Sequence, residues 1–159
     1  MFIDLLLSQG RLGPAAVIGT GCWCENNGNN NLCAVIASGE GEYIMQKTLA
    51  RTLTLLTVHE VRSHSSSCND VLIPNIVSNV LESTNLFGTT HELGLVMLYA
   101  QKLDQSNFLV DLIWINSTPS MTLGYKQRQS RGATAVISRK LTSDSNSIST
   151  EGRSFLISY

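Results

Sequence analysis

The sequence predicts a mixed α/β fold with a mostly antiparallel sheet and two helices on one face. β-branched and apolar runs separated by short polar links fill the second half, for example "LGLVMLYAQ" and "FLVDLIWINS". Apolar residues recur at helical spacing after a glycine turn in the first half. A length of 159 residues with 43% hydrophobic and 14% charged residues fits one folded domain.

The first part of the chain is expected to form a strand pair followed by a helix. Residues 15–25 alternate as a strand does, the polar loop "ENNGNNN" follows, and residues 32–37 form a second strand that should pair with the first. A helix over about residues 41–60 should cover the sheet. Its apolar face, which should be core, consists of Met45, Leu49, Leu53 and Leu56.

The rest of the chain is expected to add a second helix and an antiparallel meander. After the polar break "RSHSSSCND", a helix should cover about residues 70–83, with Pro74 tolerable only in its first turn. The expected strands are "LGLVMLYAQ", "FLVDLIWINS", "MTLGYKQ", "ATAVISRK" and a last one at "SFLISY". Residues 141–152 are expected to be a flexible polar segment.

Charge and hydropathy narrow the range of partners. The chain has 11 Lys and Arg against 12 Asp and Glu, a net charge of -1, and it has no basic run. Neither nucleic acid nor a membrane surface is therefore an expected partner. The opening "MFIDLLL" is broken by Asp4 and is too short for a signal segment or a membrane span. We expect an intracellular protein, cytoplasmic or nuclear.

The four cysteines leave two interpretations open. Cys22, Cys24, Cys33 and Cys68 are too few and too irregular for a disulfide framework, so reduced thiols are expected. "CWC" with Cys33 offers three thiolates to zinc, but Cys22 and Cys24 should share one face of a strand, which favours core packing. We therefore expect no metal and no cofactor. The histidines show no triad spacing and are assigned no chemistry.

The stretch "AVIASGEGEYIMQKTLARTL" predicts a strand that runs through a glycine turn into a helix. Gly39 and Gly41 permit a positive φ and close approach to a ligand, and the helix directs unpaired N–H groups at the turn. Such a turn suits a phosphate, a carboxylate or a developing oxyanion. "SGEGEY" lacks "GK[ST]" and a full dinucleotide fingerprint, so nucleotide binding has little support. Taken alone, Arg11 suits a solvated turn and Ser38 a helix cap.

Four blocks together resemble one family. "GRLGPAAVIGTGCWCENNG", "AVIASGEGEYIMQKTLAR", "LIWINSTPSMTLGY" and "AVISRK" follow one another from about Gly10 to Lys140. In this order they resemble the C-terminal part of the threonine aspartase (taspase) family, within the asparaginase group of N-terminal nucleophile (Ntn) hydrolases. The "GR" and "SGxGE"-like segments are shared with asparaginases and isoaspartyl peptidases, whereas "GCWCEN" and "SMTLGY" look more like taspase. Several ordered blocks are more specific than any single glycine motif.

The resemblance implies part of a four-layer αββα sandwich and a threonine-type endopeptidase that cuts after aspartate. In this family, autocatalytic processing frees the amino group of the nucleophilic threonine. Arg11 matches the arginine that binds a substrate carboxylate with two parallel hydrogen bonds. Ser38 and Gly39 match positions that form the oxyanion hole, and Gly41 matches one that lets the chain pass close to the substrate. The implied partners are a peptide with aspartate at the cut site and further subunits in a homo- or hetero-oligomer.

The chain departs from the family pattern at its nucleophile. Aligned on Arg11, the second catalytic hydroxyl falls near Met1 and the nucleophilic threonine before it, so neither lies in this chain. Thr20 follows a glycine but should lie within a strand, and we interpret it as structural. Residues 1–159 are thus expected to be a single partial domain, like the C-terminal β subunit, inactive without the N-terminal segment or α subunit and left with a naked sheet edge.

Two further departures concern specificity. Pro14 stands where asparaginases carry an aspartate that holds the substrate's free amino group, which favours peptide cleavage. Glu40 lies between the turn glycines and would repel an anionic substrate if its carboxylate pointed inward. The alternatives that stay open are an asparaginase or isoaspartyl peptidase remnant and a non-catalytic pseudoenzyme that binds carboxylates.

Overall fold

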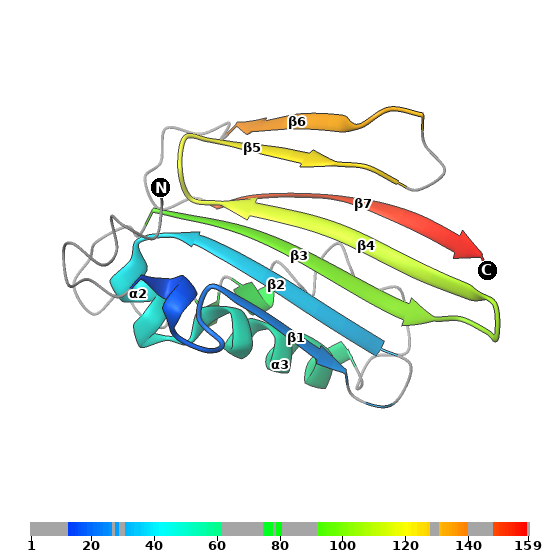
Figure 1. Ribbon diagram of the computed structural model, residues 1–159, viewed down its shortest axis with the longest axis horizontal. Helices are drawn as coiled ribbons and strands as arrows, with labels where there is room; N and C mark the ends of the chain where they lie inside the picture. The colour runs from blue at the N-terminus through cyan, green and yellow to red at the C-terminus, as the bar shows by residue number, and fades with distance from the viewer. Residues whose placement is uncertain are drawn as a thin grey trace.

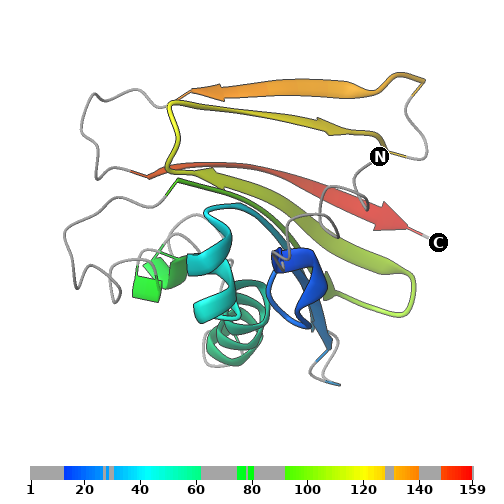
Figure 2. The ribbon, with the colours of Figure 1, turned by 60° about the vertical axis from the view of Figure 1, so that its left-hand side comes forward.

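The structure, a computed structural model, describes residues 13–26, 28, 31–61, 75–77, 79–80, 92–127, 131–139 and 148–158. The elements follow the order η1 (Pro14–Ala16), β1 (Cys22–Asn26), β2 (Asn31–Gly39), α2 (Gly41–Gln46), α3 (Leu49–Val61), β3 (Leu93–Lys102), β4 (Asn107–Asn116), β5 (Ser120–Tyr125), β6 (Thr134–Arg139) and β7 (Ser149–Ser158). Helices cover one side of a large sheet and β5–β6 lie on the other (Figure 2). The predicted mixed α/β class with mostly antiparallel strands is confirmed.

The large sheet has the strand order β1-β2-β3-β4-β7, and every neighbouring pair is antiparallel (Figure 1). The expected pairing of β1 with β2 is confirmed. The expected single meander is wrong beyond β4, because β5 and β6 form a separate two-stranded sheet and β7 returns to pair with β4. β4 is buried on both faces over most of its length, so it needs a layer on each side.

The single long helix expected after the glycine turn is interrupted. α2 and α3 are separated by a short break in which Thr48 takes a left-handed φ of 43°. The break shifts the apolar face: Leu49 and Leu53 are fully buried, whereas Leu56 is 37% exposed and Met45 is only half-buried. Among the described residues, no helix is both long and apolar enough to cross a membrane.

The strand expected over residues 15–25 begins only at Cys22. Pro14 opens a short 3-10 helix, and Gly19 takes a φ of 82°, which no extended strand contains. The alternating apolar letters before Cys22 therefore belong to a turn. The expectation failed because alternation alone does not distinguish a strand from a turn that a proline has started.

Thr20 is buried in this turn and joins it to α3. Its hydroxyl lies 2.7 Å from the carbonyl oxygen of Val17 and also contacts a second carbonyl of the turn. Its own carbonyl accepts from the N–H of Ala50 at 3.1 Å, and the carbonyl of Gly19 accepts from the N–H of Arg51 at 2.8 Å. First-turn amides of α3 are thereby satisfied. The structural interpretation of Thr20 agrees with these contacts, although its predicted place within a strand is wrong.

The main core lies between the helices and the large sheet. Alternate residues of β2 and β3 face the helices and are buried: Cys33, Val35, Ala37, Leu93, Leu95, Met97 and Tyr99. α3 packs on β1 and β2, as Figure 1 shows. Residues 75–77 and 79–80 are helical, within the second helix expected over about residues 70–83, and they contribute Ile76, Val77 and Val80 to the same core. Pro74 lies outside the described residues.

The opposite face of the large sheet is covered only in part. The ring of Tyr125 on β5 lies 5.9 Å from that of Phe155 on β7, and the sulfur of Met121 lies beside Gly94 on β3. The half of this face formed by β1, β2 and β3 remains open, because Ile36 is 60% exposed and Leu98 is 38% exposed. We call this surface the open half-face.

Core packing of the cysteines is confirmed for Cys33 and wrong for Cys22 and Cys24. Cys33 faces the helices and is fully buried. Cys22 and Cys24 share the opposite face of β1, as the alternation predicts, but that face is open and both thiols are exposed. The three thiols therefore do not converge on one metal ion. Burial, with a smaller contribution from Cys24, raises the pKa of the Cys33 thiol to about 12. Cys68 lies outside the described residues.

The C-terminal strand is longer than expected. β7 begins at Ser149 rather than near residue 154 and pairs with β4 along its whole length. Residues 149–152 of the segment expected to be flexible are therefore part of a strand. Residues 141–147 lie outside the described residues.

Candidate functional site

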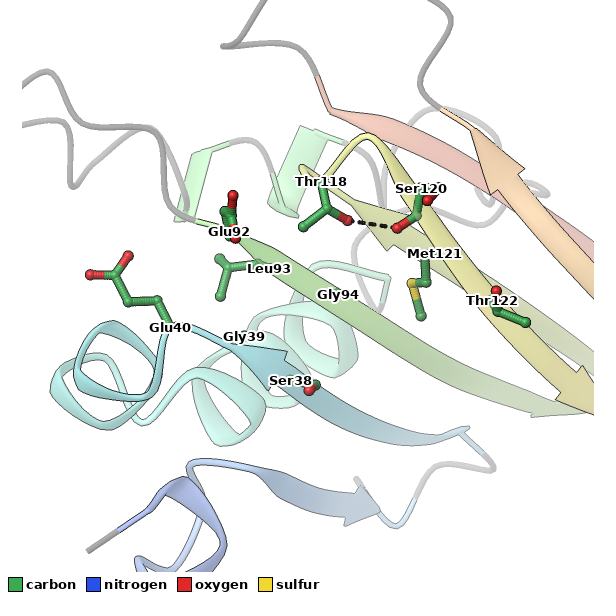
Figure 3. Close-up of a pocket in the computed structure, with 10 residues that line it drawn as sticks. All are labelled: Ser38, Gly39, Glu40, Glu92, Leu93, Gly94, Thr118, Ser120, Met121 and Thr122. Atoms are coloured by element: carbon green, nitrogen blue, oxygen red, sulfur yellow. Dashed lines mark hydrogen bonds between the residues drawn. The ribbon is translucent and has the colours of Figure 1, made fainter. Parts of the chain in front are cut away.

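A hollow of about 900 Å³ opens where β2 ends, β3 begins and β5 passes over them (Figure 3). Its walls carry backbone groups of the three strands, hydroxyl residues of β2 and β5, and the carboxylates of two residues that adjoin β2 and β3. The lining residues are Ser38, Gly39, Glu40, Glu92, Leu93, Gly94, Thr118, Ser120, Met121 and Thr122. The glycine turn singled out in the sequence thus forms one wall of this hollow.

Gly39 occupies a position that only glycine fits. Its φ is 138°, and a Cβ there would lie 2.1 Å from the carbonyl oxygen of Glu92 and 2.9 Å from the Cα of Leu93. The next N–H, that of Glu40, donates to the same Glu92 carbonyl at 3.0 Å. The prediction of a positive φ is confirmed for Gly39. The missing side chain lets the end of β2 lie directly against the start of β3.

Gly41 has a different role in the fold. It is the first residue of α2 and is not among the described residues with positive φ, so that expectation is wrong for Gly41. A Cβ on Gly41 would lie 3.2 Å from the Cδ of Pro14. The absence of a side chain therefore makes room for a proline ring, and Gly41 is not part of the lining of the hollow. Its approach to a substrate stays a prediction.

Ser38 is exposed on the face of β2 that also carries the hollow. The residue before α2 is Glu40, whose side chain makes no capping hydrogen bond, so Ser38 is not the helix cap. Because the N–H of Glu40 is already bonded to Glu92, a donor for an oxyanion at this corner has to come from the Ser38 hydroxyl or another backbone group. α2 has only 6 residues, which limits its contribution as a dipole.

Glu40 and Glu92 place two carboxylates at the rim of the hollow. Both residues are exposed. Figure 3 shows the Glu40 side chain extending away from Ser38 rather than toward it. The Glu40 carboxylate therefore repels an anion in the hollow less than an inward-pointing carboxylate would, because it points away and is exposed to water.

The β5 wall was not predicted as part of a site. Thr118, Ser120, Met121 and Thr122 line the hollow, and the Thr118 hydroxyl donates to the carbonyl of Ser120 at 3.1 Å. Ser120 and Thr122 alternate with Met121 along β5, so their side chains point to the opposite face of the strand. Met121 extends from β5 toward Gly94 (Figure 3). A signal was present in the sequence, because a cluster of hydroxyl residues, "STPSMT", directly follows the buried strand "FLVDLIWIN".

A buried polar network fixes this wall to the sheet. The Asn116 side chain is fully buried, and its Nδ2 donates to the carbonyl of Thr118 at 2.7 Å. The Ser138 hydroxyl lies 2.6 Å from Glu151 Oε1 and 3.1 Å from Asn116 Oδ1. Since it carries one proton, the shorter contact with the carboxylate is the stronger bond. The network thus connects β4, β6 and β7 beneath the segment that enters β5.

The structure brings together two of the four predicted site residues. Ser38 and Gly39 line the same hollow, whereas Gly41 lies next to it against Pro14. Arg11 lies outside the described residues, so its role in binding a carboxylate stays a prediction. In the described part of the chain, no group of three or more His, Cys, Asp or Glu side chains is arranged to hold a metal ion.

The fold agrees with part of an αββα sandwich, because it has a helix layer, an antiparallel sheet and two strands of a second sheet. The candidate site lies at the strand ends, where the glycine corner is next to hydroxyl groups. The family model described as Asparaginase matches residues 7–83, just under half of the 159-residue chain. The match supports the asparaginase-type family of Ntn hydrolases and, with it, a hydrolase. The matched segment includes all four predicted site residues, namely Arg11, Ser38, Gly39 and Gly41.

Proposed function

We propose that this chain is the C-terminal, β-subunit-like part of a threonine aspartase, a threonine-type endopeptidase that cuts peptide bonds after aspartate. In this proposal the nucleophile is the N-terminal threonine of a segment outside the chain, released by autocatalytic processing. Arg11 binds the aspartate side chain of the substrate, and Ser38 and Gly39 stabilise the oxyanion. The reaction needs no cofactor.

Pro14 is the observation that favours peptide cleavage over hydrolysis of a free amino acid. It occupies the position at which asparaginases hold the substrate's amino group with an aspartate. Here its ring lies beside Gly41 and carries no acceptor for an ammonium group. A free asparagine therefore loses a charged contact, whereas an internal residue of a peptide has no ammonium group to satisfy.

The size of the hollow also suits a peptide. A volume of about 900 Å³ lies toward the upper end of the range that small-molecule sites occupy, which is roughly 300–1,000 Å³. Ser38 and Thr118 add hydroxyl groups to the wall of the hollow, and a hydroxyl can both donate to and accept from residues that flank the cut bond. These groups suit a polar, extended substrate.

The partner in this proposal is the family's N-terminal segment or α subunit. It adds strands beside β5. Among the described strands, β5 pairs only with β6, so its other edge is available for such pairing. An active enzyme is then a hetero- or homo-oligomer of processed chains.

The test uses the completed enzyme, with the upstream segment restored, and peptides that carry aspartate or asparagine at the cut position. Arg11→Ala should lower kcat/KM on the aspartate peptide by about 30- to 1,000-fold, because a charge-assisted and two-pronged contact is lost. Arg11→Lys should recover only part of this loss, since a point charge cannot reproduce the planar fork. The wild type should discriminate strongly between the peptides, and Arg11→Ala should treat them nearly alike. A variant that keeps the wild-type preference would show that Arg11 does not form the carboxylate pocket.

A second pair of variants separates the peptidase from an asparaginase. Pro14→Asp restores a carboxylate and should raise the rate on free asparagine relative to the aspartate peptide, whereas Pro14→Ala should not. The substrates are asparagine, an isoaspartyl dipeptide and the aspartate peptide, all assayed with the completed wild-type enzyme as well. If the wild type prefers asparagine or the dipeptide, the chain is an asparaginase-type remnant instead. The chain of residues 1–159 alone should hydrolyse none of them.

A further inference from the structure

Two exposed thiols lie side by side on an apolar part of the open half-face. Cys22 and Cys24 point to the same face of β1, at the edge of the large sheet, and both are exposed. They share a second hollow, of about 640 Å³, which is separate from the candidate active site. Its lining, mostly apolar, consists of Pro14, Ala15, Ala16, Val17, Ile18, Gly19, Cys22, Trp23, Cys24, Ala34, Val35 and Ile36.

The strand geometry keeps the two thiols too far apart for a disulfide and close enough to share one atom. Alternate residues of a strand lie about 6.7 Å apart, whereas a disulfide needs Cβ atoms at about 4 Å. Rotation about χ1 can bring each sulfur roughly 1 Å closer to the other. The resulting separation approaches the roughly 4.6 Å spanned by two metal–sulfur bonds of about 2.3 Å in a line.

We propose that Cys22 and Cys24 bind one soft, thiophilic cation, Cu(I), in a two-coordinate site on β1. Thiolate ligands favour Cu(I) over harder ions. Binding forms two Cu–S bonds, releases both thiol protons to the solvent and leaves a site with a net charge of −1, without any change of oxidation state. The walls of the shared hollow are mostly apolar, so apart from the two thiols its side chains supply no ligand for the metal.

The surroundings favour two ligands over the four that zinc prefers. Cys33 faces the helices on the other side of the sheet and stays in the core. Glu25 also points to that other side, where its Oε2 accepts a hydrogen bond from Trp23 Nε1 at 2.9 Å. No third side chain of the type that binds metals joins the pair among the described residues. A tetrahedral zinc site is therefore incomplete, whereas a linear Cu(I) site is not.

The experiment is an anaerobic titration of the full chain with Cu(I) in competition with bicinchoninate, in a Cys68→Ser background. We expect one equivalent to bind, with an ultraviolet thiolate-to-copper band. Cys22→Ser and Cys24→Ser should each weaken binding on the order of 100-fold or more, because the second, linked ligand is lost. Both positions are exposed, so serine should not disturb the fold. Cys33→Ala is the matched control and should bind Cu(I) as before.

A measurement without variants keeps the test independent of folding. In the unsubstituted chain, one equivalent of Cu(I) should protect Cys22 and Cys24 together from alkylation by N-ethylmaleimide, as read by peptide mass spectrometry. Alkylation of either thiol at its metal-free rate overturns the proposal. Undiminished affinity in the Cys22→Ser/Cys24→Ser double variant does so too. Half an equivalent per chain with dimer formation would also overturn it, since the metal would then join two copies.

Discussion

Replacing Gly39 with alanine tests whether the corner between β2 and β3 depends on the absence of a side chain. The φ of 138° is a conformation that other residues rarely adopt. A Cβ would lie 2.1 Å from the carbonyl oxygen of Glu92 and 2.9 Å from the Cα of Leu93. Both obstacles are backbone atoms, so no neighbouring side chain can rotate away. The two strands have to separate at this end.

The expected cost combines two effects. A non-glycine residue in a sparsely populated backbone region costs about 1–3 kcal/mol. Separation of the strands also breaks the bond from the N–H of Glu40 to the Glu92 carbonyl, worth about 1 kcal/mol. We expect a loss of roughly 2–4 kcal/mol in the free energy of unfolding. For a chain of this size that lowers Tm by roughly 4–16 °C.

Urea unfolding and thermal melts, both followed by circular dichroism, measure this loss against two glycine controls. Gly28 has a φ of 70° but open space around a Cβ, so Gly28→Ala reports backbone strain alone and should cost about 1–2 kcal/mol. Gly124 has neither a positive φ nor a close neighbour, and Gly124→Ala should change stability by less than about 0.5 kcal/mol. If Gly39→Ala costs no more than Gly28→Ala, the close approach of the two strands is not what selects glycine.

Three further predictions concern stability. Burial in the folded protein raises the pKa of the Cys33 thiol from 9.0 to about 12, so this thiol contributes its full stabilisation below pH 9. Between pH 9 and 12 the thiol ionises only in the unfolded chain, and the free energy of unfolding should fall by about 1.4 kcal/mol per pH unit. Urea titrations should show this slope in the wild type and not in Cys33→Ala; equal slopes would contradict it. Asn116→Ala should cost about 2–3 kcal/mol in urea unfolding, since the buried network loses its centre. An equal cost for Asn107→Ala, a half-buried residue whose side-chain hydrogen bonds are exposed to solvent, would refute this. Thr20→Val should lower stability by about 1–2 kcal/mol in the same assay while Thr20→Ser stays near wild type, and similar losses in both variants would rule out the hydroxyl as the cause.

Most strands could be predicted because their signal is local. The run "FLVDLIWIN" is apolar on both faces, and the structure indeed buries β4 from both sides. The run does not state which strands provide the cover. β7, rather than β5, is the strand that pairs with β4, and β5 lies in the second sheet. Which strand pairs with β4 therefore depends on contacts between distant segments. The helix break at Thr48 also depends on tertiary contacts, since the carbonyls of Gly19 and Thr20 accept hydrogen bonds from N–H groups in the first turn of α3.

In the candidate site, too, the residues with a local sequence signal could be predicted and those that depend on distant contacts could not. Ser38 and Gly39 were recognisable because the glycine turn is a short, contiguous pattern. The β5 wall was missed because Thr118 and Thr122 reach the hollow only after the chain has crossed the sheet. The positions of Cys22 and Cys24 on one strand face followed from alternation, but whether that face is covered depends on partners that lie elsewhere in the chain or outside it.

The return of β7 to β4 has a consequence for folding during synthesis. Asn116 at the end of β4 lies opposite Ser149 at the start of β7, so β4 gains its second neighbour only after the β5–β6 excursion is complete. Closing that loop costs about 3 kcal/mol of chain entropy if the excursion is unstructured, and less once β5 and β6 have paired. Until then an apolar edge of β4 is open to other chains. The two-stranded sheet thus shortens the period in which the nascent chain can aggregate.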